Sequence, residues 1–121
     1  MTIKTYRDLE IWQKGMKVVS EIYRLTENFP GAERFGLVSQ MRRSAVSIPS
    51  NIAEGFRRFH NKEYVQFLYV SLGSVAEIET QLTISRNLGF LKEKEENEFL
   101  QELNILSGMI MNLIKKIKGK I

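Results

Sequence analysis

The side chains that could carry out catalysis are few in this sequence. His60 is the only histidine, and there is no cysteine. These facts exclude disulfides, thiolate metal sites, a cysteine nucleophile and a metal site built on two histidines. No glycine-rich phosphate loop is present either, since neither Gly31 nor Gly36 is followed by the Lys-Ser or Lys-Thr that completes such a loop. We interpret His60, next to a predicted turn, as an incidental surface residue.

Carboxylates are the remaining candidates for acid–base chemistry. Glu77 and Glu79 stand two residues apart on a predicted helix, where about 100° per residue places their side chains roughly 200° apart. They cannot act as one catalytic pair at that angle. The Glu-x-x-His motif that supplies ligands in di-metal helical bundles is absent as well. The sequence therefore predicts a protein that is not an enzyme and that has no catalytic residues, no metal site and no cofactor.

Basic residues gather in two stretches, 55–62 and 103–121, that contain no acidic residue, although the net charge of the chain is only +4. Such clusters can contact phosphates, but the solvated ends of helices carry them too. A nucleic-acid-binding surface and ordinary helix ends both remain open. The candidate nucleic-acid-binding residues are Arg57, Arg58, Lys62, Lys115, Lys116 and Lys118.

Four segments repeat apolar residues every three or four positions, which is the spacing of an amphipathic α-helix. They cover about residues 6–28, 33–59, 62–89 and 92–118. Thr5 and Asn61 are the predicted N-caps of the first and third helices. Short connections favour antiparallel neighbours. The sequence thus predicts an all-α, up-down-up-down four-helix bundle that occupies residues 1–121 as a single domain.

Two of these helices carry features that a plain bundle helix lacks. In the second, Pro49 removes one helical hydrogen bond and presses on the carbonyl of Ala45, so we expect a kink there that either widens a binding surface or only accommodates packing. In the first, two apolar stripes together span about 200°, more than one core contact needs. Self-association would cover the surplus, although a helix central in the monomer would have the same pattern. The stripe expected to face a neighbouring subunit contains Ile11, Val18 and Ile22.

Several charged residues fall on the predicted helices close to these apolar stripes. An unpaired buried carboxylate costs several kcal/mol, so we expect oppositely charged partners nearby. The sequence does not say which residue pairs with which. The members of the predicted structural ion-pair network are Arg42, Arg43, Glu54, Glu77 and Glu79.

Several stretches of the chain together resemble a known family. They are Leu9 to Gln13, Phe29-Pro30 with Glu33 and Phe35 to Leu37, Gln40 to Ala45, Ser47 to Gly55, and Gly73-Ser74 with Glu77. The block Ser-Ile-Pro-Ser-Asn-Ile-Ala-Glu-Gly is the most specific of them. Together they resemble the small four-helix-bundle proteins encoded in intervening sequences of bacterial 23S ribosomal RNA genes, a fold shared with the accessory variability determinant of diversity-generating retroelements.

The resemblance implies a ring-shaped homopentamer with a basic surface for nucleic acid, and it supplies no catalytic residues. We therefore expect a homo-oligomer that binds RNA or DNA without base specificity. The alternative is a protein-interaction adaptor, for example for a reverse transcriptase. The chain has no apolar run of about 18 residues and no signal-peptide pattern. With the absence of cysteine, this predicts a cytoplasmic protein without a membrane partner.

Overall fold

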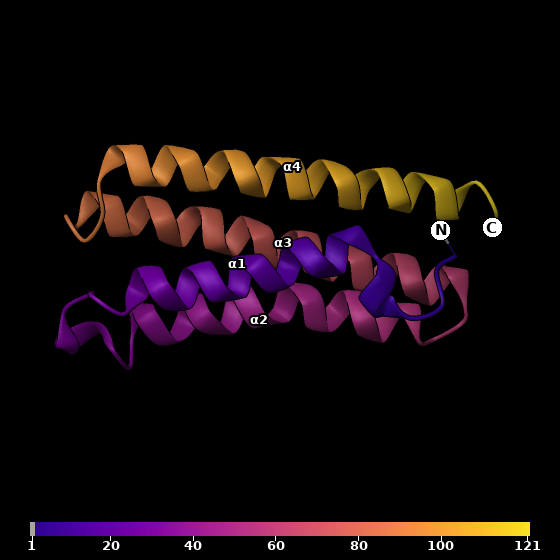
Figure 1. Ribbon diagram of the computed structural model, residues 1–121, viewed down its shortest axis with the longest axis horizontal. Helices are drawn as coiled ribbons and strands as arrows, with labels where there is room; N and C mark the ends of the chain where they lie inside the picture. The colour runs from indigo at the N-terminus through magenta and orange to yellow at the C-terminus, as the bar shows by residue number, and fades with distance from the viewer. Residues whose placement is uncertain (1) are drawn as a thin grey trace.

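The computed structural model describes residues 2–121, and these residues form helices without any strand. A short 3₁₀ helix precedes α1 and another precedes α2. Successive long helices run in opposite directions, so the arrangement is the predicted up-down-up-down bundle (Figure 1). None of the helices described is long and apolar enough to span a membrane. The elements are η1 (Tyr6–Asp8), α1 (Glu10–Thr26), η2 (Gly31–Glu33), α2 (Leu37–Phe56), α3 (Asn61–Asn87) and α4 (Glu93–Lys118).

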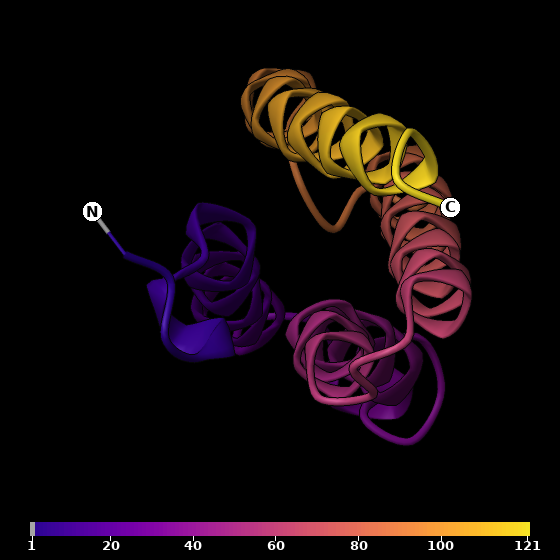
Figure 2. The same cartoon turned by 90° about the vertical axis from the view of Figure 1, so that its right-hand side faces the viewer.

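The four helices follow one another around an arc when the bundle is viewed from its end (Figure 2). α2 packs against both α1 and α3, and α3 packs against α4. α1 and α4, at the two ends of the arc, meet far less closely. The core lies inside this arc, and its completely buried side chains include Ile22, Met41, Ile48, Ile52, Leu68, Ile78, Leu82, Leu103 and Ile110.

The helix boundaries differ from the predicted ones chiefly at the N-terminal ends of the first three helices, and α2 also ends at Phe56, three residues before its predicted end. Thr5 and Asp8 do form the predicted capping box, with the Thr5 hydroxyl accepting from the Arg7 amide at 3.1 Å and the Asp8 carboxylate accepting from the Thr5 amide at 3.0 Å. They cap the 3₁₀ turn, because the extended backbone of Leu9 separates it from α1. α2 likewise begins only at Leu37, after η2. Asn61 is the first residue of α3 rather than its N-cap.

The apolar spacing of α4 predicts one buried seam, and the structure departs from it near the C-terminal end. The predicted seam is Phe99, Leu103, Leu106, Ile110, Leu113 and Ile117. Phe99, Leu103, Leu106, Ile110 and Ile117 are buried as predicted, but Ile114 is the buried residue in the penultimate turn and Leu113 is only half-buried. A strict alternation of four- and three-residue steps has a period of 3.5. A straight α-helix has 3.6 residues per turn and drifts from that period by about 20° per heptad. Along α4 this drift turns Leu113 away from the core, so that the next residue, Ile114, takes the buried position.

α2 continues through Pro49 without interruption. Near the proline, hydroxyl side chains of α3 form hydrogen bonds with the backbone and a side chain of α2. The Ser71 hydroxyl donates to the Ile48 carbonyl at 2.9 Å, and the Ser74 hydroxyl donates to the Ser47 hydroxyl at 2.8 Å. On the other side, a Cβ at Gly15 would lie 3.4 Å from the Pro49 ring. α1 thus packs closely on α2 at the proline, with little free space beside the glycine. These contacts agree with the packing interpretation of Pro49.

The stripe of α1 that was expected to face another subunit faces the monomer core instead. Ile11, Val18 and Ile22 are 5%, 4% and 0% exposed, so a second copy cannot reach them and this interface prediction is wrong. The other stripe remains partly open, with Met16 and Tyr23 both more than 40% exposed. The surplus apolar surface is therefore present, but on the opposite stripe.

The predicted ion-pair network is wrong as well, because most of its members point outwards. Glu54 pairs with Arg58 on the surface at 3.1 Å. Arg43 and Glu77 are exposed, and within residues 2–121 neither they nor the half-buried Glu79 form an ion pair.

Arg42, the remaining member of the predicted network, binds the last turn of α1. Its Nε donates to the Thr26 hydroxyl at 3.0 Å, and its guanidinium lies 4.5 Å from the centre of the Tyr23 ring. Its Nη2 donates to the Tyr23 carbonyl at 3.3 Å. A cation at a helix C-terminus is favourable because unsatisfied carbonyls carry partial negative charge there. Arg42 thus fastens α1 to α2 without an acidic partner.

A buried ion pair does exist, and it joins α3 to α4. Glu96 is only 5% exposed and pairs with Arg86, while its second oxygen accepts from the Thr83 hydroxyl at 2.7 Å. Both oxygens of the buried carboxylate are therefore satisfied, which removes most of the cost of burying it.

We predict that Arg86→Ala lowers stability by roughly 2–3 kcal/mol, less than the 3–5 kcal/mol typical of a fully buried pair because the Arg86 side chain still reaches water. Arg58→Ala breaks the exposed pair with Glu54 and should cost under about 1 kcal/mol. Urea unfolding of both variants measures the difference. Equal small losses would contradict the assignment of Glu96 as a buried charge that requires its partner.

Candidate nucleic-acid interface

The alternating helix directions bring the two basic clusters of the sequence to the same end of the molecule. α2 and α4 end there, α3 begins there, and the N-terminal segment lies beside them (Figure 1). Acidic residues at this end are Asp8, Glu10, Glu54 and Glu63. They are outnumbered by exposed cations. The basic end, as we define it, consists of Lys4, Arg7, Arg57, Arg58, Lys62, Lys115, Lys116, Lys118 and Lys120.

The opposite end of the bundle is close to neutral. The first turn of α4 contains Glu93, Glu95 and Glu96, and Glu98 follows in the next turn. Cations balance these and the other acidic residues of that end: Arg24, Arg34, Arg42, Arg43, Arg86, Lys92 and Lys94. The excess positive charge is therefore concentrated at the basic end, where it attracts a polyanion even though the net charge of the chain is only +4.

Aromatic rings orient several of the cations at the basic end. The guanidinium of Arg57 lies 5.6 Å from the centre of the Tyr6 ring, and that of Arg58 lies 5.2 Å from the Phe67 ring. The ammonium of Lys118 lies 3.5 Å from the Tyr69 hydroxyl. Such contacts hold a cation in place without cancelling its charge. The positive charges of Arg57 and Lys118 therefore stay available to an anion in solution, whereas Arg58 also pairs with Glu54.

Close packing of α2 on α3 positions the turn that carries Arg57 and Arg58. A Cβ at Gly55 would lie 2.7 Å from the Phe67 Cβ, so only glycine lets the two helices approach this closely. Among the predicted nucleic-acid-binding residues that the structure describes, only Arg58 is engaged in an ion pair. The structure thus brings all six predicted residues to one end and leaves five of them without an acidic partner.

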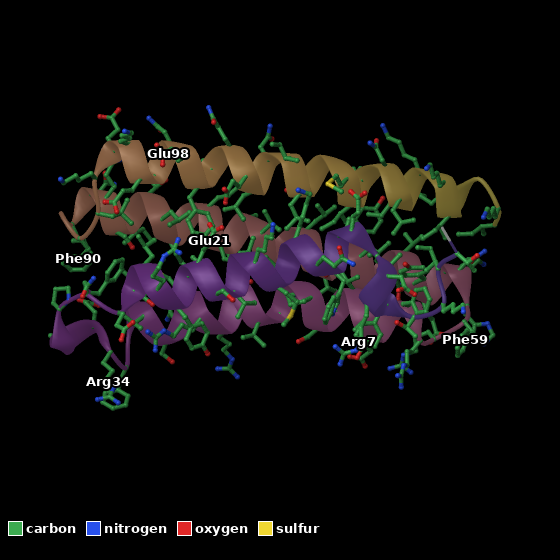
Figure 3. The ribbon with its side chains drawn as sticks, viewed as in Figure 1. Arg7, Glu21, Arg34, Phe59, Phe90 and Glu98 are labelled. Atoms are coloured by element: carbon green, nitrogen blue, oxygen red, sulfur yellow. The ribbon has the colours of Figure 1, made fainter. Side chains whose placement is uncertain are left out.

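Phe59 also belongs to this surface, and the sequence reasoning missed it. It lies in the turn directly after Arg58 and is 85% exposed (Figure 3). A signal was present in the sequence, because Arg-Arg-Phe-His places an aromatic residue inside a basic turn. His60, the next residue, is exposed as well.

A groove of about 450 Å³ lies where α1 and α4 meet, and it is acidic. Burial, followed by a hydrogen bond and charge repulsion from Glu102, raises the pKa of Glu21, while Arg24 and Lys17 oppose the shift. This surface repels phosphate. In the part of the chain that the structure describes, no three His, Asp or Glu side chains lie close enough to share a metal ion. The lining residues include Glu21, Arg24, Glu95, Glu98, Phe99 and Glu102.

A second groove, of about 290 Å³, lies on the outer side of α1 and α2 and is mainly apolar. It contains the half-buried Trp12 and Val19 and the more exposed Met16 and Val46. This groove follows the stripe of α1 that the core leaves open. The residues around it are Tyr6, Trp12, Met16, Val19, Val46, Pro49, Ser50 and Ala53.

Comparison with known proteins identifies a family and a fold. The sequence model of the 23S rRNA-intervening sequence proteins matches residues 7–112. A solved structure of a protein of unknown function from the S23 ribosomal protein family of Bacteroides thetaiotaomicron is similar over 87% of this chain and 95% of its own length, with a TM-score of 0.80 and 18% identity. At that identity the likeness shows the fold alone. No curated protein matches the sequence.

We predict that the acidic groove makes the bundle less stable as pH rises. In the folded protein the pKa of Glu21 lies above its ordinary value of 4.5. The contribution of Glu21 to stability is therefore fully present at a pH below its pKa in the unfolded chain. This contribution is lost as the pH rises through its pKa in the folded protein. Glu21→Gln removes this loss and should raise the melting temperature at pH 7 but not at pH 4. Exposed Glu10 provides the control, as Glu10→Gln. Parallel melting curves for wild type and Glu21→Gln across this range would contradict the prediction.

Proposed function

The chain belongs to the 23S rRNA-intervening sequence protein family, and we propose that it is a non-enzymatic homo-oligomer, of five copies, that binds RNA or DNA through its basic end. The observation that carries the proposal is the convergence of two basic clusters, far apart in sequence, at one end of a bundle whose other end carries acidic and basic residues in similar number. We place the protein in the cytoplasm, where it would meet such ligands.

The proposed binding is electrostatic and does not read base sequence. The residues involved are lysines and arginines on a helix end and a turn. Contacts of this kind bind phosphates and release counterions, which gives affinity without sequence recognition. In a ring of five copies, the basic ends would lie close together. The modest charge of one chain would then become a large local field.

Self-association is supported by the apolar groove on α1 and α2. Met16 and Val46 are each 42% exposed and lie beside the half-buried Trp12. An apolar surface of this kind is usually covered by another protein surface. The number five comes from the resemblance to a pentameric family, since the groove itself does not set a number.

The same groove favours an alternative in which the partner is a different protein. In that case the chain is an adaptor, for example an accessory subunit of a reverse transcriptase, and the partner binds the nucleic acid. The two proposals differ in what the purified chain does alone. Only the first requires purified protein to bind RNA or DNA.

We predict that purified protein binds RNA and DNA of any sequence, with log affinity falling by about 0.7–0.9 per log unit of salt for each phosphate contacted. Replacing both Arg57 and Arg58 with Ala should reduce this slope and leave the oligomer intact. The double variant Arg34→Ala with Lys94→Ala makes the same change in net charge at the other end. It should bind almost as the wild type does. Fluorescence anisotropy at several salt concentrations measures the slopes.

Two results would change this assignment. If replacing Lys115, Lys116 and Lys118 with Ala abolishes binding while the Arg57/Arg58 variant binds normally, the C-terminal lysines are the site. These substitutions leave the buried Ile117 in place. If wild-type protein at tens of micromolar in about 50 mM salt binds no nucleic acid, the adaptor becomes the better proposal.

We predict a mass near five times 14.1 kDa in sedimentation or light scattering at micromolar concentration. Met16→Glu should lower that mass while the helical content stays unchanged, because it puts a charge into the apolar groove. Ile105→Glu changes an apolar α4 residue that is 58% exposed and lies outside this groove. It should keep the wild-type mass. A monomeric wild type would refute self-association, and dissociation by Ile105→Glu alone would move the interface to α4.

A further inference from the structure

Phe59 has an unfavourable backbone conformation and little contact with the rest of the protein. Its φ is +60°, and it is the only non-glycine residue with positive φ among residues 2–121. The left-handed region is unfavourable for a residue with a bulky side chain. An exposed side chain, at 85%, recovers little of that cost through burial. The stability of the monomer therefore does not explain why phenylalanine stands here.

The position of Phe59 places its ring among cations. Arg57 and Arg58 precede it and Lys62 follows it, all exposed at the turn between α2 and α3. Its side chain projects from the end of the bundle in Figure 3. The lysines at the end of α4 lie at the same end of the molecule (Figure 1). The turn therefore presents an aromatic face within reach of a phosphate chain held by its neighbours.

We propose that Phe59 stacks on an unpaired base and that the basic end is a site for single-stranded RNA or DNA. This inference rests on the proposed nucleic-acid binding. It adds that the ligand is single-stranded and that Phe59 is the residue that distinguishes a single strand from a duplex. Every base has a π-face, so stacking on an aromatic ring tolerates any sequence. In a duplex both faces of each internal base are covered by its neighbours. A ring at a protruding turn can therefore stack fully only on a strand that is not paired.

Phe35 provides a matched control within the same chain. It is 90% exposed and also stands in a connection between helices, but at the opposite end of the bundle. The Arg34 guanidinium lies 5.7 Å from the centre of its ring. Phe35 lines a groove with Arg34, Arg42 and Arg43. It thus shares with Phe59 its exposure and neighbouring arginines, and differs in lying at the end where acidic residues balance the cations.

The test compares Phe59→Ala and Phe35→Ala on a mixed-sequence single strand and on the matching duplex in about 50 mM salt. Phe59→Ala should weaken single-strand binding about 5- to 150-fold, which corresponds to the 1–3 kcal/mol measured for stacking of one base. Its salt slope should stay at the wild-type value, because no phosphate contact is lost. Duplex binding should stay unchanged. Phe35→Ala should match the wild type on both ligands, and Phe59→Trp should retain single-strand binding.

Phe59→Gly separates stacking from folding. Glycine adopts positive φ without strain, so this variant should melt at a higher temperature than Phe59→Ala and at least as high as the wild type. It should lose single-strand affinity to the same extent as Phe59→Ala. Weaker binding by a better-folded protein cannot result from damage to the fold.

Three results would overturn the inference, and they can be told apart. If the wild type binds single strands and Phe59→Ala binds them equally well, stacking is refuted while the proposed electrostatic binding stands. If the wild type binds neither ligand, the proposed function fails and the inference fails with it. If Phe59→Ala lowers the mass of the oligomer without lowering the affinity per subunit, Phe59 is a contact between subunits.

Discussion

The close packing of α2 against both of its neighbours is the constraint on which the rest of the bundle depends. α1 meets α4 only lightly and reaches the core mainly through α2. Two glycines lie at these contacts, with Gly15 facing Pro49 and Gly55 facing Phe67. A side chain at Gly55 would push α2 and α3 apart, because its Cβ would lie 2.7 Å from that of Phe67. A Cβ at Gly15 would lie 3.3 Å from the Ile48 Cγ2 and would require only a small shift of that side chain. The hydroxyl of Ser71 then bonds the α2 backbone beside the proline, so the same contact fixes α3.

The basic end follows from this packing and from the antiparallel order of the helices. Once α2 and α3 are fixed side by side, the turn between them has to lie beside the C-terminus of α4. Arg57 and Lys118 come to the same end although the whole of α3 and almost the whole of α4 separate them in sequence. The cations are also favourable at the C-termini of α2 and α4, because the unsatisfied backbone carbonyls there carry partial negative charge. Their convergence stabilises the helix ends and at the same time creates a field that a polyanion would meet.

The role of each charged residue depends on where its side chain lies in the bundle. Arg42 lies over the end of α1 and bonds carbonyl and hydroxyl oxygens there, whereas Arg43 and Glu77 point into water. Glu96 is the acid that the core requires to be paired. A buried carboxylate without a partner is expensive, and an exposed one is not. The location of the side chain therefore decides its role more than its proximity in sequence to other charges.

Much of the fold could be predicted from the sequence, because helical periodicity and caps are local properties. The four helices and most of the α4 seam followed from apolar spacing, and the antiparallel order followed from the short connections. The residue types at Thr5 and Asp8 predicted the capping box, although it caps η1 rather than α1. The tertiary structure decided which stripe of α1 is buried, since Ile11 and Met16 both lie on apolar stripes and the packing of the neighbouring helices buries only the stripe of Ile11. It also decided that Arg86 pairs with Glu96 and that Phe59 stands exposed in a strained turn. The physical reason is the same in each case: burial and pairing depend on helices that are distant in sequence, and a local pattern carries no information about their relative positions.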